Sequence, residues 1–167
     1  MLSVTSLLVN FYIYTLKEIS EYSELFFNTL NILMSVNNEI DDENLKSANH
    51  LKACEILCKS YRYHFDKKDN DVCIKILNII YEISEKVNGN DFYKLSLLVF
   101  KYIDQKEAVI FYNSNKQRID SLKFSNEMSD LIKDGSIDHV EYNYLLSTFY
   151  ENTNILSNYI DEKEALN

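Results

Sequence analysis

Three residues that could bind a soft metal ion recur along one stretch of the chain. His50, Cys54 and Cys58 are spaced four residues apart, so on a helix they would lie on nearly one face. Structural zinc sites, however, usually draw their ligands from two elements at the shorter Cys-x-x-Cys spacing. Because the three residues border an apolar stripe, and buried free cysteine is common, we expect core positions for them and neither a metal nor another cofactor.

A cysteine nucleophile would need a base beside it and a lowered pKa. His64 and His139 exist, but nothing in the sequence places either of them next to a cysteine. Helical ribonucleases of the HEPN class carry an Arg followed by a His a few residues later. Arg62 has His64 too close for that motif, and Arg118 has no His within reach. The sequence therefore favours a protein that is not an enzyme.

Acidic residues near the C-terminal end invite comparison with a calcium-binding loop. Asp134, Gly135, Asp138 and Glu141 occur there, but the alternating Asp and Asn ligands and the closing Glu of such a loop are missing. The pattern predicts instead that one helix stops at Asp134 and Gly135. It also predicts that Asp138 caps the start of the last helix.

Aromatic and basic residues interleave over residues 59–64, which read KSYRYH. Aromatic rings beside cations can stack nucleobases, so an effector that acts on nucleic acid or a nucleotide through an unrecognised site is one alternative. The formal net charge of −9 argues against general nucleic-acid binding, because a phosphate backbone would be repelled. Only residues 52–123 are basic on balance, with thirteen Lys and Arg against ten acids.

The elements that position these residues are predicted to be helices. The chain has 167 residues, 46% of them hydrophobic, no proline and only two glycines, Gly89 and Gly135. Sheets and Rossmann-type folds need more turn-forming residues than this. We therefore expect an all-α fold, a bundle of six to seven helices in one domain over residues 1–167, with a frayed acidic tail over residues 161–167.

Apolar residues at three- and four-residue steps give the expected helix limits: about 4–37, 42–65, 71–88, 92–103, 105–113, 119–133, and from Asp138 onward. Ser20 or Ser23 could break the first of these by capping a second segment. The helix over 71–88 is apolar around much of its circumference, so we expect it near the centre of the core. Gly89 is expected to cap it in a left-handed conformation.

Residues 1–16 carry no charged side chain, and the first one along the sequence is Lys17. These residues are expected to form a buried or partner-facing helix. The stretch is short for a membrane span, and contact of residues 1–16 with a membrane is kept as the alternative. No basic residue precedes it, which argues against a secretory signal. Three cysteines without framework spacing indicate free thiols in a reducing compartment. The expected location is therefore the cytoplasm.

Two segments carry a family resemblance. Residues 24–33 read ELFFNTLNIL, and residues 92–94 read FYK ahead of QKEAVIFYN at 105–113. With the apolar helix near residues 76–81 between them, these segments resemble the phage abortive infection proteins of bacteria over roughly residues 20–125. That family usually carries N-terminal membrane-spanning helices, for which this chain offers only residues 1–16. The resemblance implies phage defence and no particular reaction.

The function expected from the sequence is a non-enzymatic helical interaction module in bacterial phage defence, acting through a protein partner or through self-association as an oligomer. An alternative is a viral apoptosis-regulator-like bundle that binds an amphipathic helical peptide, although that family's Asn-Trp-Gly-Arg signature is absent. The residues proposed as interaction candidates come from residues 1–16 and from the two family-like segments. They are Phe11, Tyr12, Phe26, Phe27, Asn28, Phe111, Tyr112 and Asn113.

Overall fold

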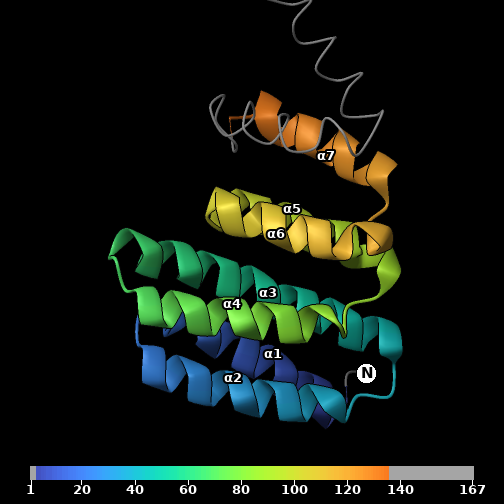
Figure 1. Ribbon diagram of the computed structural model, residues 1–167. Coiled ribbons are helices and arrows are strands. Elements are labelled where there is room, and N and C mark those ends of the chain that lie inside the picture. The colour runs from blue at the N-terminus through green and yellow to red at the C-terminus, as the bar shows by residue number, and fades with distance from the viewer. Residues whose placement is uncertain (1–2, 136–167) are drawn as a thin grey trace, which may run out of the picture. The chain divides into compact units, whose positions relative to one another are not determined.

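The computed structural model describes residues 3–135, and these residues contain seven α-helices, two short 3-10 helices and no strand (Figure 1). The predicted all-α helical class is confirmed. The helices are α1 (Val4–Glu18), α2 (Ser23–Asn38), α3 (Glu43–Asp66), α4 (Asn70–Ser84), α5 (Phe92–Tyr102), α6 (Gln105–Asn115) and α7 (Ser121–Lys133), with η1 (Gly89–Asp91) and η2 (Lys116–Arg118) between them.

The chain divides into two compact units, one ending at Asp91 and the other beginning at Phe92. The expectation of one domain over residues 1–167 stays a prediction. In the first unit, α1 pairs with α2 and α3 pairs with α4, while α3 also contacts both α1 and α2 (Figure 1). The central helix of this unit is therefore α3, and the expectation that the helix beginning near residue 71 lies at the centre is wrong.

Side-chain caps explain where α1, α3 and α4 begin. The Ser3 hydroxyl accepts a hydrogen bond from the backbone N–H of Ser6, the Asp42 carboxylate accepts from Asn44 and Leu45, and the Asp69 carboxylate accepts from Val72. Each cap satisfies N–H groups that have no partner within the helix. The expected break near Ser20 or Ser23 is confirmed, because α1 ends at Glu18 and α2 begins at Ser23.

One expected helix end is wrong. The helix predicted over 71–88 ends at Ser84, and Gly89 lies in η1 without a positive φ. Within residues 3–135, the left-handed positions are Lys68, with a φ of 61°, and Gly135, with a φ of 81°. Lys68 closes α3, and Gly135 follows α7, as the sequence predicted for Asp134 and Gly135. The last predicted helix, from Asp138, lies outside the described residues.

An aromatic cluster holds the second unit together. Phe100 on α5, Tyr112 on α6 and Phe124 on α7 lie with their ring centroids 5.1–6.0 Å apart in all three pairs. All three side chains are buried. Rings at such distances contribute attraction beyond the area that they bury, so one residue from each helix ties the three helices to one another.

Candidate interaction surface

Five apolar residues of α1 point away from the core. We call this set the outward face of α1, and its members are Val4, Leu7, Leu8, Phe11 and Tyr14. Their exposed fractions run from 42% for Leu8 to 75% for Val4, with 60% for Phe11 and 65% for Tyr14. The spacing of three and four residues places the five side chains in one stripe along the helix.

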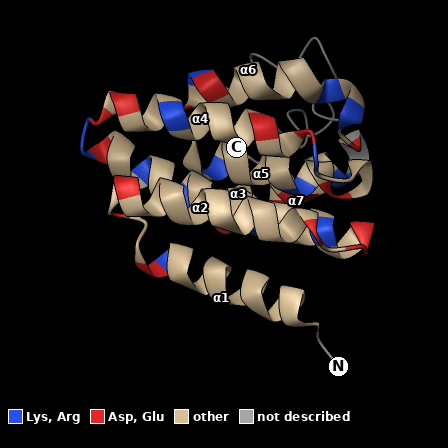
Figure 2. Cartoon of the chain, turned by 90° about the horizontal axis from the view of Figure 1, so that it is seen from below, with Lys and Arg blue, Asp and Glu red and all other residues tan. Residues whose placement is uncertain are grey.

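The opposite side of the same helix is buried. Val9, Ile13 and Leu16 are at most 6% exposed, and α1 packs on α2 and α3 through this side. No charged residue occurs in α1 before Lys17 and Glu18, so the helix is neutral along almost its whole length (Figure 2). A helix at the surface of a protein normally turns charged residues to water. In α1 both sides are apolar, and one of them is exposed.

Local contacts keep this helix regular up to its end. The Thr15 hydroxyl donates to the Phe11 carbonyl oxygen at 2.9 Å, and the Phe11 and Tyr12 rings meet edge to face with centroids 5.4 Å apart. The Ile19 N–H then donates to the Thr15 carbonyl oxygen at the C-terminal end. The outward face is thus presented by a capped helix of four turns that is anchored to the core on its other side.

The eight interaction candidates named from the sequence differ in their exposure to solvent. Phe26, Phe27, Phe111 and Tyr112 are at most 6% exposed, so their rings lie in the core of their units. The other four are more accessible. Phe11, Asn28 and Asn113 are exposed, and Tyr12 is half-buried.

Asn28 adjoins a second group of exposed residues. It lines an open depression together with Tyr22 and Leu25, both more than half exposed, and with the carboxylates of Glu21 and Glu24. The depression lies at the start of α2, just beyond the C-terminal end of α1. Asn113 lines a polar depression with Lys116 and Arg118, in the second unit.

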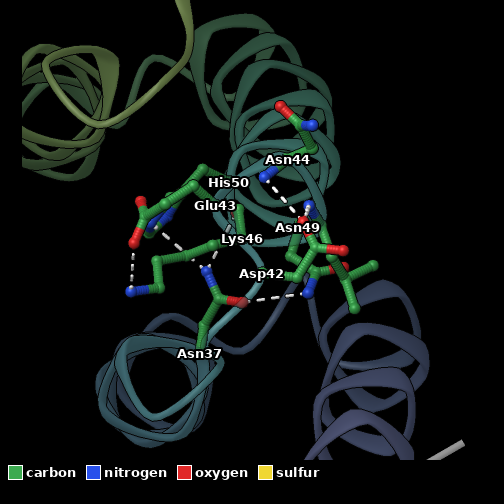
Figure 3. Close-up of polar contacts among 8 residues, drawn as sticks. Asn37, Asp42, Glu43, Asn44, Lys46, Asn49 and His50 are labelled. Carbon is green, nitrogen blue, oxygen red and sulfur yellow. Dashed lines mark hydrogen bonds and ion pairs between the residues drawn. The ribbon is translucent and has the colours of Figure 1, made fainter.

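A buried polar cluster joins α2 to α3 (Figure 3). The Asn37 side-chain amide donates to the Lys46 carbonyl oxygen at 3.1 Å and lies 3.3 Å from His50 Nε2, while the Asn49 amide donates to Asn37 Oδ1 at 2.9 Å. An amide nitrogen can only donate, so His50 Nε2 accepts and the proton of the neutral ring is on Nδ1. The cluster fixes the angle between two helices that support α1.

Burial decides the charge state of His50. Desolvation, followed by the repulsion of Lys86 and Lys46, lowers the pKa of His50 from 6.5 to about 4. The ring is 1% exposed, and the described residues give Nδ1 no hydrogen-bond partner. At neutral pH the ring is therefore uncharged and serves as a hydrogen-bond acceptor within the fold.

Burial also raises the pKa of the three cysteine thiols. Burial raises the pKa of Cys54 to about 12, and burial together with Cys54 and Glu55 raises the pKa of Cys58 further. Burial and Asp69 raise the pKa of Cys73, whose thiol donates to the Tyr61 carbonyl oxygen at 3.8 Å. Because the thiolate is the form that acts as nucleophile and metal ligand, these raised pKa values oppose both roles at neutral pH. Within residues 3–135, no three or more His, Cys, Asp and Glu side chains gather in a way that could hold a metal ion.

The aromatic and basic residues at the end of α3 contact one another. Arg62 lies over the Phe65 ring at 5.2 Å and 3.9 Å from Asp66, and Lys67 lies over the Tyr63 ring at 5.6 Å. Of the two tyrosine rings in residues 59–64, Tyr61 is buried against the Phe65 ring, with centroids 5.7 Å apart, and Tyr63 already lies next to Lys67. His64 is buried, with Nδ1 3.9 Å from an Asp69 carboxylate oxygen. His139 and Glu141, also considered from the sequence, lie outside the described residues.

Comparisons of the chain with protein-family models, with curated proteins and with solved structures find no significant match. The resemblance to phage abortive infection proteins therefore stays a prediction. None of the helices in residues 3–135 is both long enough and apolar enough to cross a membrane.

Sequence reasoning found one member of the outward face, Phe11, and missed the other four. The signal was present as a second stripe at positions 4, 7, 8, 11 and 14, on the side opposite Val9, Ile13 and Leu16. Two apolar stripes on one helix look like a helix that is buried all round, which is the usual reading of such a pattern. Only the packing shows which of the two stripes the core covers.

Proposed function

We propose that the protein is a non-enzymatic, cytoplasmic interaction module that acts through protein contacts made by the outward face of α1. The observation that carries this proposal is the stripe of five exposed apolar side chains on a helix without charge before Lys17. Contiguous exposed apolar patches on folded proteins mark binding surfaces, because covering them removes apolar area from water. The three free, buried thiols support a reducing compartment.

The chemistry of the described residues supports contact as the mode of action. The histidine in the polar cluster is neutral and hydrogen-bonded to Asn37, and the thiols have raised pKa values. The accessible surface of α1 offers no acid, base or nucleophile along its first thirteen residues apart from hydroxyl and amide groups. Such a face can exclude water and pack against another apolar face, which is what a binding surface requires.

We further propose that these contacts serve bacterial phage defence, as the resemblance over residues 20–125 implies. In the two family-like segments the rings of Phe26, Phe27 and Phe111 are core residues, so those segments supply the fold. The surface of α1 lies outside them. The role in defence and the contact surface are therefore separate parts of the proposal and need separate readouts.

Plaque formation on bacteria that express the chain tests both parts. The informative substitution is Leu7→Asp, because Leu7 is 54% exposed on the outward face of α1. The matched control is Ile74→Asp, because Ile74 is 57% exposed on α4. The wild-type chain and the Ile74→Asp variant are expected to lower plaque counts, and Leu7→Asp to lose the effect at equal protein level. Protection by Leu7→Asp equal to wild type would contradict the surface, and no protection by any chain would contradict the defence role.

A further inference from the structure

We infer that the occupant of the outward face of α1 is the same face of a second copy of this chain, with the two α1 helices packed antiparallel about a two-fold axis. This inference rests on the proposed function, and it names the partner that the outward face of α1 binds. A two-fold interface uses one patch twice, so the patch must be complementary to itself. An uncharged stripe of aliphatic and aromatic side chains meets that requirement.

The absence of charge favours α1 as the face that a second copy approaches. The molecule carries a formal net charge of −9, so two copies repel each other on balance. Residues 4–16 carry no charged side chain, and Figure 2 shows α1 free of charge except at its C-terminal end. Contact through this part of α1 therefore brings no like charges face to face.

Charge also decides the direction of the pairing. The C-terminal end of α1 and the start of α2 carry three acids, Glu18, Glu21 and Glu24, against one base, Lys17. Glu18 continues the outward stripe by helical spacing. The N-terminal end of α1, after the Ser3 cap, carries no acid and has the positive pole of the helix dipole. Antiparallel packing places Glu18 of each copy beside the positive pole of the other. Parallel packing would place the acidic ends side by side.

The size of the face limits the area that pairing can bury. An aromatic side chain buries about 150–250 Å², and Val and Leu side chains are smaller, so the exposed parts of the five side chains come to at most about 600 Å² per copy. A stable interface buries about 800 Å² per partner. An interface below that size is typical of reversible association, so we expect a dimer whose population rises with concentration and not an obligate dimer.

Sedimentation equilibrium of the full chain from low to high micromolar concentration tests the inference. We expect a monomer–dimer equilibrium for the wild type and for the Ile74→Asp control. Leu7→Asp and Phe11→Asp are each expected to raise the dissociation constant by at least about tenfold, because a carboxylate would lose its hydration inside an apolar contact. Thermal unfolding of each variant checks that the fold is kept, which exposed positions favour.

Glu18→Gln separates the two directions of packing. Antiparallel packing predicts a weaker dimer, because an attraction to the partner's helix pole is lost, whereas parallel packing predicts a stronger one, because a repulsion is lost. A wild-type monomer at every concentration would overturn the inference, as would a dimer that tolerates both Leu7→Asp and Phe11→Asp, or a stronger dimer with Glu18→Gln. If the wild type is monomeric while Leu7→Asp still abolishes phage protection, a different protein covers the face and the proposed function stands.

Discussion

The Phe11 ring meets the Tyr12 ring edge to face with centroids 5.4 Å apart, yet Phe11 remains 60% exposed while Tyr12 is half-buried. Phe11 thus lies on the outward face, and Tyr12 lies at the border between that face and the buried side of α1. An aromatic ring that is supported from one side and open to water on the other is preorganised for contact, because little side-chain freedom is left to lose on binding. This relationship makes Phe11 the expected centre of the interaction surface.

Replacing a leucine by alanine should lower the free energy of unfolding more on the buried side of α1 than on its outward face. Leu16→Ala removes a fully buried side chain and is expected to lower the free energy of unfolding by about 2–5 kcal/mol. Leu7→Ala, on the outward face, is expected to change the free energy by no more than about 0.5 kcal/mol. Urea unfolding of dilute protein measures both. Equal losses for the two variants would show that the outward stripe is part of the core.

Stability should fall in acid through His50. The ring titrates at 6.5 in the unfolded chain and at about 4 in the folded one, so between these pH values only the unfolded chain binds the proton. The contribution of His50 is complete above pH 6.5 and falls by about 3 kcal/mol as the pH drops toward 4.

His50→Gln keeps a side chain that can accept from Asn37 and removes the titration. The loss of stability between pH 7 and pH 5, measured by urea unfolding, should therefore be smaller in this variant than in the wild type. The carboxylates are the same in both chains and cancel in the comparison. An unchanged pH dependence would show that His50 does not carry the effect.

The three cysteines should report unfolding. Cys54 and Cys58 are fully buried and Cys73 is 5% exposed, and the pKa of each thiol is raised. Labelling with a thiol reagent at neutral pH should therefore be slow in native protein, and it should accelerate in urea along the unfolding curve. Fast labelling of any thiol in native protein, located by mass spectrometry, would contradict the burial of that residue.

The stability of the second unit should depend on the aromatic cluster. Phe124→Ala removes the ring that contacts both Phe100 and Tyr112, and we expect it to cost about 3–5 kcal/mol. Phe124→Leu keeps most of the volume and should cost less. Hydrogen exchange followed by mass spectrometry should show the loss of protection in α5, α6 and α7. Unchanged exchange in these helices would mean that the cluster does not hold them together.

The sequence predicted the helices well because their signals are local. Apolar periodicity gave most of the limits, and Asp42 marks the start of α3 as expected. The prediction that Gly89 caps the preceding helix was wrong. Glycine suggests a left-handed cap, whereas the chain turns through η1 at this position. The centre of the first unit was also missed, since α3 is polar in composition and buries Asn49 and His50 through hydrogen bonds that depend on partners distant in sequence.

The interaction surface was predictable only in part, because exposure is a property of packing. Periodicity identifies the residues that share a side of α1 but cannot say which side α2 and α3 cover. The rings of Phe27 and Phe111 were interaction candidates for their place in family-like segments, and the fold uses both in its core. Leu7, with no such motif around it, is exposed.

The most direct measurement is photo-crosslinking from the outward face of α1 in living cells. A photoreactive amino acid replaces Leu7 in one variant of the protein. In a second variant it replaces Ile74, which is similarly exposed on α4. The account predicts one defined crosslinked protein from position 7, with the mass of a second copy if the dimer is the partner, and none from position 74. The same products from both positions, or none from position 7, would contradict it.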